Sequence, residues 1–459
     1  MLKYLSLIIR YRFFHMLLTL PIKIDTTPEQ KSVLWDLSEK CRLIYNFGLR
    51  ERQDAYKNKT RIGYVNLQNK LPELKKKFPD YRWVYSKVLQ GTLKCLDNNY
   101  KSFFNLRNNK DKKAKPPGFK GRKYFTTMLY NQSGFEISDS NGYVIVSKSM
   151  DTRIHKPEVE YSEQDKVYIG FSHNHPSGVS LKFELPATLI EDKIFSKATD
   201  IVQVNIYQKD KDFYISITYE VLDVKHNNND SYLAIDIGVS KQSMVDSYGK
   251  FTELKNRRPD KYWEPKIQQI QSRRDHCQKN SRKWKRLHNN LGKIKRKSSN
   301  QLKDNQHKIT RNIIDNTDAN TIIIGKLDVK QMASSEPKDS RYEKSIHRST
   351  HNSGHIGRFT QFLTYKAESL GKRVIRIDES YTSKKCCICG TIKNMSLNDR
   401  TYECGYCGNI LDRDYNSSVN ILLRYFKHNA LWTSYQNTID NLRQTGLLIG
   451  VIPTRMIPK

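Results

Sequence analysis

The stretch SYLAIDIGVSKQSMV, residues 231–245, indicates the edge of an α/β sheet. It begins with a short apolar strand that ends at Asp236, and Gly238 then precedes a second strand-like run. A carboxylate at the end of such a strand projects from the sheet toward solvent, as metal sites on α/β sheets require. Many strands end in Asp-x-Gly only because this pair turns well, so Asp236 needs partners elsewhere in the chain.

A buried strand is also predicted at TIIIG, residues 321–325, where three isoleucines follow one another. The chain then turns outward at Gly325 and Lys326, so no acid stands at the end of this strand. A further strand, VIRID at residues 374–378, follows a helix that Gly371 ends, and it leads directly to Glu379. Acids therefore follow the first and the last of these strands but not TIIIG.

Two CxxC pairs separated by fourteen residues have the spacing of a structural zinc ribbon, in which four thiolates close a tetrahedral Zn²⁺ site. Gly390 and Gly408 follow the pairs and allow the tight turns. Cys387 is predicted to be a bystander, because only one residue separates it from Cys389. The predicted zinc ligands are Cys386, Cys389, Cys404 and Cys407.

The segment LDRDYNSSVNILLRYF, residues 411–426, follows the second CxxC pair. It predicts an amphipathic helix that carries Val419, Ile421 and Leu422. An acid at the start of this helix can cap it or help to coordinate a cation above the sheet. We expect Asp412 to be the cap or a charge partner and Asp414 to be the ligand, although spacing alone does not separate these roles.

The chain has 459 residues and a formal charge of +33, since 80 Lys and Arg face 47 Asp and Glu. Such an excess needs a polyanionic partner, and nucleic acid is the obvious one. A membrane is the rival, but charged residues break the first twenty residues, so neither a signal peptide nor a span is expected. Met1 and Met16 are both candidate starts, and the mass of the N-terminal peptide distinguishes them.

Five of the eight cysteines crowd into residues 386–407, which favours metal binding in a reducing compartment over disulfides.

The first half of the chain predicts a strand (LLTLPIKI) and two long helices before a β-rich module. The first helix begins with the capping box Thr27-Pro28-Glu29-Gln30 and runs toward Tyr56. The second ends near Arg107, and the apolar stripes of both are expected to pack in the core. Residues 125–221 alternate as strands do, most clearly in the hairpin at 202–221, and a polar linker follows at 226–230.

Several segments remain open to two interpretations. The basic loop at 107–124 and the Lys/Arg-rich helical hairpin at 262–318 are either solvated charge runs or nucleic-acid contacts, and the global charge favours contact for the hairpin. His173 and His175 lie in FSHNHPSG without a third ligand nearby, which favours an exposed turn over a metal pair. The polar stretch 332–355 is a mobile lid or disordered.

Together these motifs resemble the TnpB family of insertion-sequence-encoded RNA-guided nucleases, which are relatives of the eukaryotic Fanzor proteins and the type V CRISPR effectors. The resemblance covers nearly the whole chain. It rests on PEQ, YNFGLR, PGFKGRK, AIDIG, GKLDVK, YTSKKCCICG, the second Cys pair and DRDYNSSVNI.

The resemblance implies a multidomain α+β protein. A β-barrel-like wedge domain, residues 1–45 and 115–225, would carry an inserted helical recognition lobe, residues 46–114. A RuvC nuclease domain of RNase H-like fold, residues 231–380 and 411–428, would carry an inserted zinc ribbon, residues 381–410, and a C-terminal tail would follow at 429–459.

The chain departs from the family pattern at one point. Most members carry Glu where Gly325 stands and a proline-like residue where Glu379 stands, whereas a Fanzor-like subset reverses this. Neighbouring strands lie about 4.8 Å apart, so a glutamate one strand further from Asp236 can reach the site if nothing obstructs it. Gly325 leaves that space open, and we therefore expect Glu379 to be the relocated ligand.

The resemblance implies a DNA endonuclease that a guide RNA from the transposon end directs to double-stranded DNA with a short adjacent motif. Asp236, Glu379 and Asp414 would hold two Mg²⁺ ions, and the ribbon would hold one structural Zn²⁺. We expect a monomer with its RNA and no membrane partner, at the nucleoid of a prokaryote or in a eukaryotic nucleus. The alternatives are a nuclease-dead RNA-guided DNA-binding regulator and a nuclease or transposition accessory that needs no guide.

Overall fold

The computed structural model describes residues 15–109, 113–131, 133–147, 154–155, 165–222, 224–326, 355–396 and 399–444. The chain divides into two compact units, Met1–Asp223 and Val224–Lys459, and each is described by itself. Of the predicted segments, the first fourteen residues, the polar stretch before His355 and the tail beyond residue 444 lie outside the described residues.

The first unit contains a four-stranded antiparallel sheet in the order β1-β8-β7-β2. The predicted N-terminal strand pairs along its whole length with the second strand of the predicted hairpin. This pairing confirms that the β-rich module takes one strand from before the helices. The strands are β1 (His15–Ile24), β2 (Met128–Asn131), β7 (Ala198–Lys209) and β8 (Asp212–Leu222).

A second antiparallel sheet of the first unit has the order β4-β3-β5-β6 and shares a hydrophobic core with the first sheet. A short helical segment, α5 (Ala187–Ile190) with the π-helix η2 (Glu191–Phe195), separates β6 from β7. The alternating pattern did not predict it, because Ile190 and Ile194 also read as strand residues but are buried from a helix. The strands are β3 (Phe135–Asp139), β4 (Val144–Val146), β5 (Lys166–Phe171) and β6 (Leu181–Pro186).

The two predicted long helices of the first unit are confirmed as α1 (Pro28–Lys57) and α4 (Ser86–Asn108). In the capping box, the Thr27 hydroxyl accepts from the Gln30 backbone, and the Gln30 side chain accepts from the Thr27 backbone. The apolar stripe of α1 is buried, and that of α4 is buried through Leu96, whereas Tyr100 and Phe103 near its end are only half-buried. Between them lie α2 (Tyr64–Asn69), α3 (Leu71–Lys77) and η1 (Pro79–Trp83).

The second unit is built on a five-stranded sheet in the order β11-β10-β9-β12-β13. The first three strands in the chain are antiparallel neighbours, whereas β12 runs parallel to both β9 and β13. The strands are β9 (Tyr232–Ile237), β10 (Lys241–Asp246), β11 (Phe251–Lys255), β12 (Thr321–Gly325) and β13 (Arg373–Ile377). The strands that end near Asp236, Gly325 and Glu379 are β9, β12 and β13, and they therefore lie side by side.

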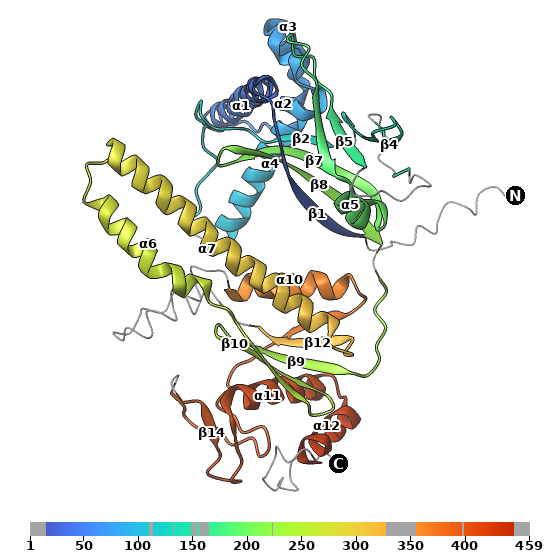
Figure 1. Cartoon of the computed structure of the whole chain (residues 1–459), viewed down its shortest axis with the longest axis vertical. Coiled ribbons are helices and arrows are strands. Elements are labelled where there is room, and N and C mark those ends of the chain that lie inside the picture. The colour runs from blue at the N-terminus through green and yellow to red at the C-terminus, as the bar shows by residue number, and fades with distance from the viewer. Residues whose placement is uncertain are drawn as a thin grey trace, which may run out of the picture. The chain divides into compact units, whose positions relative to one another are not determined.

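Helices cover both faces of this sheet (Figure 1). Leu233 and Ile235 of β9 pack beneath α10 (His355–Glu368) and the end of α7 (Arg282–Asp315). Tyr232 and Ala234 pack on the opposite face, beneath α11 (Arg413–His428) and α12 (Trp432–Gln444). Side chains of a strand alternate between its faces, so residue parity decides which helix layer each one meets.

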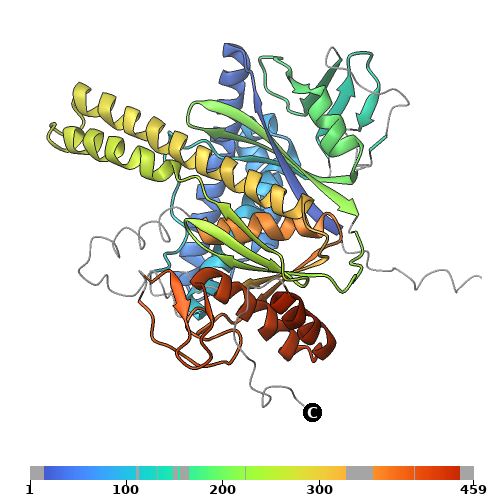
Figure 2. The ribbon, with the colours of Figure 1, turned by 60° about the horizontal axis from the view of Figure 1, so that its bottom comes forward.

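The predicted helical hairpin is confirmed as α6 (Pro259–Asp275) followed by α7, which together extend away from the sheet (Figure 2). Its surface pairs aromatic rings with cations: the Lys266 and Lys297 ammonium groups lie 5.0 and 5.2 Å from the Trp263 ring centroid. Nucleic-acid contact by this hairpin stays a prediction. Across the described part of the chain, no helix combines the length and the apolar character needed to cross a bilayer.

Candidate active site and metal centre

The three strand ends of the second unit present one face to α11. Asp236 has the parity of Tyr232 and Ala234, and Gly325 has the parity of Ile323, so both belong to this face. Ile235 pairs with Ile324, which places Asp236 and Gly325 next to one another at the ends of neighbouring strands. Glu379 lies two residues beyond Ile377, which pairs with Gly325, and so continues the same face.

The Glu379 side chain occupies the space above Gly325. A methyl group built on Gly325 would overlap the Oε2 atom of Glu379 and would lie 2.8 Å from its Cδ. The carboxyl group therefore reaches back across β12 toward β9, where Asp236 stands. Because Gly325 at the end of β12 has no side chain, the space above it can hold the side chain of Glu379, which follows the neighbouring strand β13.

The predicted carboxylates interact electrostatically. Burial, followed by the negative charge of Asp414, raises the pKa of Asp236 from 3.8 to about 6. Burial, followed by the charge of Asp236, raises the pKa of Glu379 from 4.5 to about 7. Asp236 thus connects the other two acids. Among the described residues, only four cysteines form a group whose ligand atoms all lie within 4.8 Å of one another. The carboxylate oxygens of the three acids are therefore more widely spaced than the atoms of such a ligand cluster.

Helix α11 separates the roles of its two acids. The Asp412 carboxylate accepts from the backbone N–H groups of Asp414 at 2.8 Å and Tyr415 at 3.3 Å, so Asp412 is the N-cap, as expected. The Asp414 carboxylate is free of that role. It lies 3.5 Å from the Lys241 ammonium and 3.2 Å from the Arg413 guanidinium.

The donor set suits a hard divalent cation. It consists of oxygen ligands, which Mg²⁺ prefers, and the raised pKa values of Asp236 and Glu379 show that their ionised forms are destabilised where they lie. A divalent cation between them would relieve this repulsion and favour the charged forms. The residues present therefore fit the predicted magnesium site.

Buried hydroxyl groups connect the acids, and sequence analysis missed them. The Thr382 hydroxyl donates to the Glu379 carbonyl at 2.8 Å, and the Ser417 hydroxyl lies 3.1 Å from Thr382 Oγ1. Ser417 also hydrogen-bonds Asp236, which opposes the rise of the Asp236 pKa. The available signal was the run of polar residues Asn416, Ser417 and Ser418 in a helix whose next turns are apolar, and all three are buried.

Two asparagines of α11 attach the ribbon to the same helix. The Asn416 side chain accepts from the Cys387 N–H at 3.0 Å and donates to the Lys385 carbonyl at 2.8 Å. The Asn420 amide donates to the carbonyls of Lys385 and Thr382 at 2.7 and 2.9 Å. Asn416 is fully buried, and Asn420 is 8% exposed. The NSSVN part of the motif thus aligns the ribbon with the acidic site.

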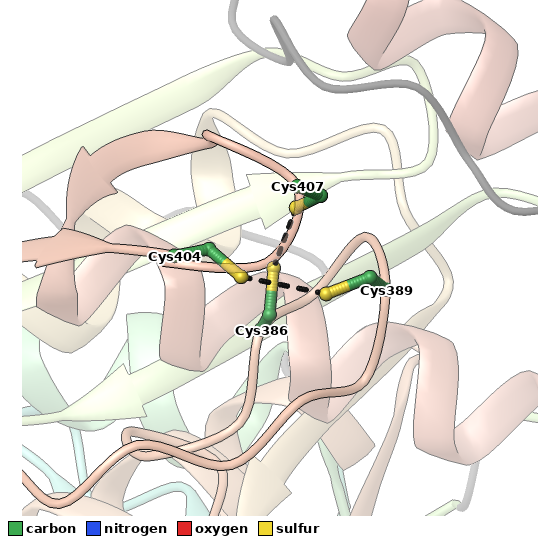
Figure 3. Close-up of side chains that lie close together, drawn as sticks. All are labelled: Cys386, Cys389, Cys404 and Cys407. Atoms are coloured by element: carbon green, nitrogen blue, oxygen red, sulfur yellow. Dashed lines mark hydrogen bonds between the residues drawn. The ribbon is translucent and has the colours of Figure 1, made fainter.

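The predicted zinc ligands converge in one cluster (Figure 3). The Sγ atoms of Cys386 and Cys407 lie 3.7 Å apart, and those of Cys389 and Cys404 lie 3.4 Å apart. Zn–S bonds of about 2.3 Å in a tetrahedron require S···S distances of roughly 3.8 Å, close to both values. None of these cysteines is in a disulfide. The cluster therefore fits a structural metal ion such as Zn²⁺.

The two halves of the ribbon have the same local geometry. Gly390 N–H donates to the Cys386 carbonyl and Gly408 N–H to the Cys404 carbonyl, at 3.0 and 2.9 Å. Both glycines have positive φ, 79° and 70°, which a residue with a Cβ rarely adopts. The short strands β14 (Thr401–Glu403) and β15 (Ile410–Asp412) flank the second half. Cys387 is outside the cluster, and burial raises the pKa of its thiol to about 12.

Replacing Cys404 with Ser should release the metal and unfold the ribbon, because structural zinc binding is coupled to folding. We expect zinc content to fall from about one ion per chain to near zero, measured by elemental analysis of the purified protein. The matched control is Cys387→Ala, which removes a neighbouring buried thiol and should retain the ion. Equal zinc content in both variants would contradict the assigned ligands.

The pKa shifts predict how pH affects the protein when no Mg²⁺ is bound. The folded pKa values of Asp236 and Glu379, about 6 and 7, exceed the ordinary values of 3.8 and 4.5. At a pH between the unfolded and the folded pKa values, the unfolded chain has released protons that the folded chain still holds. The free energy of unfolding therefore decreases as the pH rises, and the whole decrease is reached above a pH of about 7. Thermal unfolding of the zinc-loaded protein, in a buffer without added divalent cations, should therefore show a melting temperature that decreases from pH 5 to pH 8.

The double variant Asp236→Asn, Glu379→Gln should flatten this decrease, because neither amide ionises. Asp304→Asn, at an exposed acid paired with Lys308, serves as the control and should keep the wild-type slope. A double variant with the wild-type slope would show that other groups cause the pH dependence.

The histidine pair of the first unit differs in part from the prediction. The turn is exposed at Asn174 and at residues 176–178, as predicted, but the His175 side chain is only 10% exposed. Its Nε2 lies 3.4 Å from Asp36 Oδ2, and its ring packs edge-on against Trp83. Periodicity could not foresee this, because both partners come from distant helices. Neither histidine joins a metal-ligand group within the described ranges.

The basic loop of the first unit lines a cavity of about 490 Å³. The Lys120 ammonium lies 4.0 Å from the Tyr45 ring centroid and 4.8 Å from that of Tyr124. The Lys120 carbonyl accepts from Arg42 and Asn46 of α1, which fixes this part of the loop. The loop is thus ordered around aromatic rings here, and its contact with nucleic acid stays a prediction.

Three family models match the chain. Residues 216–336 match a family described as "Probable transposase", and residues 357–421 match the "Cas12f1-like, TNB domain". Residues 16–61 match a family described as "Helix-turn-helix domain", although these residues form β1 and α1 here.

Curated relatives include a viral TnpB-like protein and a bacterial putative RNA-guided DNA endonuclease. TnpB-like protein L79 of Acanthamoeba polyphaga mimivirus is 36% identical over 143 residues, which cover 31% of this chain and 26% of that protein. The chain thus matches about a quarter of the length of this viral relative. "Putative RNA-guided DNA endonuclease InsQ" of Escherichia coli (strain K12) is 25% identical over 400 residues, which cover 83% of this chain and 86% of that protein.

A solved structure shares the fold. The cryo-EM structure of the Cas12f1-sgRNA-target DNA complex matches 86% of this chain and 83% of the solved chain, with a TM-score of 0.54 at 14% identity. At this identity the likeness concerns the fold alone. The three family matches, the relatives and the motifs agree with one another: the chain is similar to TnpB-like proteins and to a putative RNA-guided DNA endonuclease.

Proposed function

We propose that the protein is an RNA-guided DNA endonuclease of a transposable element. One observation carries the proposal: the Glu379 carboxyl group fills the space above Gly325, on the sheet face that also carries Asp236. If the site had lost its activity, nothing would maintain both the glycine at 325 and the glutamate at 379, which compensate for each other. This arrangement supports an active nuclease over a nuclease-dead regulator.

The second unit is proposed to be a RuvC nuclease domain of RNase H-like fold, residues 231–380 and 411–428, with the zinc ribbon at 381–410. The strand order supports this, since three antiparallel strands are followed by two parallel ones that begin beside the first. We also propose that residues 1–45 and 115–225 form the wedge domain, which the family resemblance implies to be β-barrel-like, and that residues 46–114 form the recognition lobe.

Asp236, Glu379 and Asp414 are the proposed magnesium ligands and catalytic residues. When bound, two Mg²⁺ ions supply an activated water for in-line attack on a phosphodiester and stabilise the departing 3′ oxygen. Asp236 bridges the other two acids, Glu379 closes the sheet side of the site, and Asp414 approaches from α11.

Other residues of the chain hold this geometry. Ser417 and Thr382 connect the Asp236 carboxyl group to the turn that carries Glu379. Lys241 lies 2.9 Å from Glu253 and 3.5 Å from both Asp412 and Asp414, so it balances charge at the start of α11. These are positioning residues, because they act through the acids.

The proposed partners are a guide RNA from the transposon end and a double-stranded DNA target with a short adjacent motif, bound by a monomeric protein. The charge of +33 supports a polyanionic partner. The similarity to InsQ, named "Putative RNA-guided DNA endonuclease", supports RNA and DNA as the partner classes. Guide pairing would supply sequence discrimination, as in Cas9-type enzymes. We propose the prokaryotic nucleoid, or the nucleus in a eukaryote, as the site of action.

The test is plasmid cleavage by the full chain purified with its RNA. The RNA is sequenced first, and its guide portion defines a matching plasmid and a scrambled one. We expect Mg²⁺-dependent cleavage of the matching plasmid only, and loss of cleavage after RNase treatment. Cleavage that survives RNase would indicate a guide-free nuclease, whereas RNA-dependent binding without cleavage would indicate a regulator.

A further inference from the structure

Strand β10, which lies beside β9 (Figure 1), contributes two polar side chains to the sheet face that carries the proposed magnesium ligands. Val245 of β10 pairs with Ala234 of β9, and both are buried in the core beneath α11. Because side chains alternate along a strand, Ser243 and Lys241 belong to the same face as Val245. The Lys241 ammonium lies 3.5 Å from the Asp414 carboxylate. The strand therefore brings Ser243 to the acidic site as well.

Ser243 is the direct cross-strand neighbour of Asp236. The antiparallel register pairs the two residues, and their side chains point to the same face of the sheet. Directly opposite residues of such a pair have Cβ atoms about 4.5–5.5 Å apart. A serine hydroxyl and an aspartate carboxylate on these two Cβ atoms come within hydrogen-bonding distance by rotation about their side-chain bonds.

The hydroxyl group of Ser243 is buried and unpaired. Ser243 is 1% exposed, and within the described part of the chain its Oγ atom has no hydrogen-bond partner. The other hydroxyl groups of the site differ, since Ser417 and Thr382 hydrogen-bond each other at 3.1 Å. Buried polar groups nearly always have a partner, and an alanine at this position would avoid the cost of an unpaired hydroxyl. This serine therefore calls for a partner on the face that it shares with Asp236.

The Asp236 carboxylate can accept this hydrogen bond. Ser417 already donates to it and opposes the rise of the Asp236 pKa, but burial and the charge of Asp414 outweigh that bond. An ionised carboxylate has about four acceptor positions on its two oxygens, so a second hydroxyl finds room. A hydrogen bond to a charged acceptor is also stronger than one between neutral groups. A donor from β10 would thus favour the form of Asp236 that binds a cation.

We propose that Ser243 is a positioning residue of the nuclease site, whose hydroxyl donates to the Asp236 carboxylate when that carboxylate is ionised and holds a cation. Asp236 then lies between two serine hydroxyls, Ser243 from β10 and Ser417 from α11, which together fix the orientation of its oxygens. Removing a group that hydrogen-bonds a metal ligand typically lowers metal affinity or activity by roughly 10–100-fold. The inference rests on the proposed function, because it requires Asp236 to be a magnesium ligand.

The first test measures metal binding without cleavage. The full chain is freed of RNA and titrated with Mn²⁺, which shares the preference of Mg²⁺ for oxygen ligands and whose free concentration is read by electron paramagnetic resonance. Asp236→Ala identifies the Mn²⁺ binding that depends on the acidic site. Ser243→Ala should weaken this binding by about tenfold or more. Unchanged affinity in Ser243→Ala would overturn the inference.

The melting temperature separates this role from simple packing. Ser243→Ala removes an unpaired buried hydroxyl, so without added divalent cations its melting temperature should equal or exceed the wild-type value. Stability and Mn²⁺ affinity should therefore change in different directions. A fall in both would show that the variant disturbs packing, and would overturn the inference. Ser298→Ala, at a buried serine of α7, is the matched control and should bind Mn²⁺ like the wild type.

The second test measures cleavage of the guide-matched plasmid over a series of Mg²⁺ concentrations. The concentration for half-maximal cleavage should rise about tenfold in Ser243→Ala, whereas the rate at saturating Mg²⁺ should fall by less. An unchanged half-maximal concentration would overturn the inference and leave the nuclease proposal standing. If the wild type shows no Mn²⁺ binding that depends on Asp236, the magnesium site and this inference fail together.

Discussion

Replacing Asp236 with Ala should reduce cleavage of a guide-matched plasmid by about 10³-fold or more, the scale seen when a residue of a catalytic unit is removed. Asp236 lies between the other two acids and interacts with both, so no neighbouring carboxylate can take its place. Binding of guide RNA and target DNA should remain, because basic surfaces supply it. Cleavage rates and gel-shift affinities measured on the same preparation separate the two effects.

Asp304→Ala is the control for this experiment. Asp304 is an exposed acid on α7 that pairs with Lys308, so its loss changes net charge equally without touching the sheet. We expect wild-type cleavage from it. Full cleavage by the Asp236→Ala variant would remove this aspartate from the active site, and the magnesium proposal would fail with it.

Replacing Gly325 with Ala should lower cleavage by about 10²-fold, because small displacements of a catalytic group have effects of that size. The added methyl group would occupy the position of the Glu379 carboxyl group and force it away from Asp236. Stability should not fall in parallel, since alanine is favoured over glycine inside a strand by roughly 0.5–1 kcal/mol. Activity and melting temperature should therefore change independently.

A double variant tests the geometry behind this effect. Gly325→Glu combined with Glu379→Ala moves the acid back to the middle strand, the arrangement that the family resemblance gives for most members. We expect the double variant to recover part of the activity that either single change removes. Gly292→Ala on α7 is the control, because an added Cβ there meets nothing within 4 Å. No recovery in a folded double variant would argue against Glu379 as the relocated ligand.

Most of the structural features that could be predicted from the sequence depend on short-range sequence patterns. The zinc ligands follow from spacing alone, because each CxxC pair closes its own turn, and the sheet strands follow from apolar runs such as TIIIG. The prediction that Glu379 replaces an acid at Gly325 came from the family resemblance, and the strand pairing places both positions at one edge of the sheet. These predictions concern residues whose geometry is local or is set by strand pairing.

The contacts missed by sequence analysis join distant segments. Ser417 reaches Thr382 across 35 positions, and the partners of Asn416 lie on the far side of the ribbon in the chain. Nothing in the spacing of either residue reveals its partner. Likewise, the sequence of α5 and η2 predicts a strand, because apolar isoleucines are buried in helices and in strands alike.

The attachment of the ribbon has an evolutionary consequence. The segment enters after Thr382 and leaves at Asp412, and both ends are held by the first two turns of α11 through Ser417, Asn420 and the helix cap. An insertion whose ends are joined this closely changes the loop-closure entropy little when its length changes. Lineages can therefore lengthen, shorten or exchange the ribbon between these two points while the acidic residues stay in register.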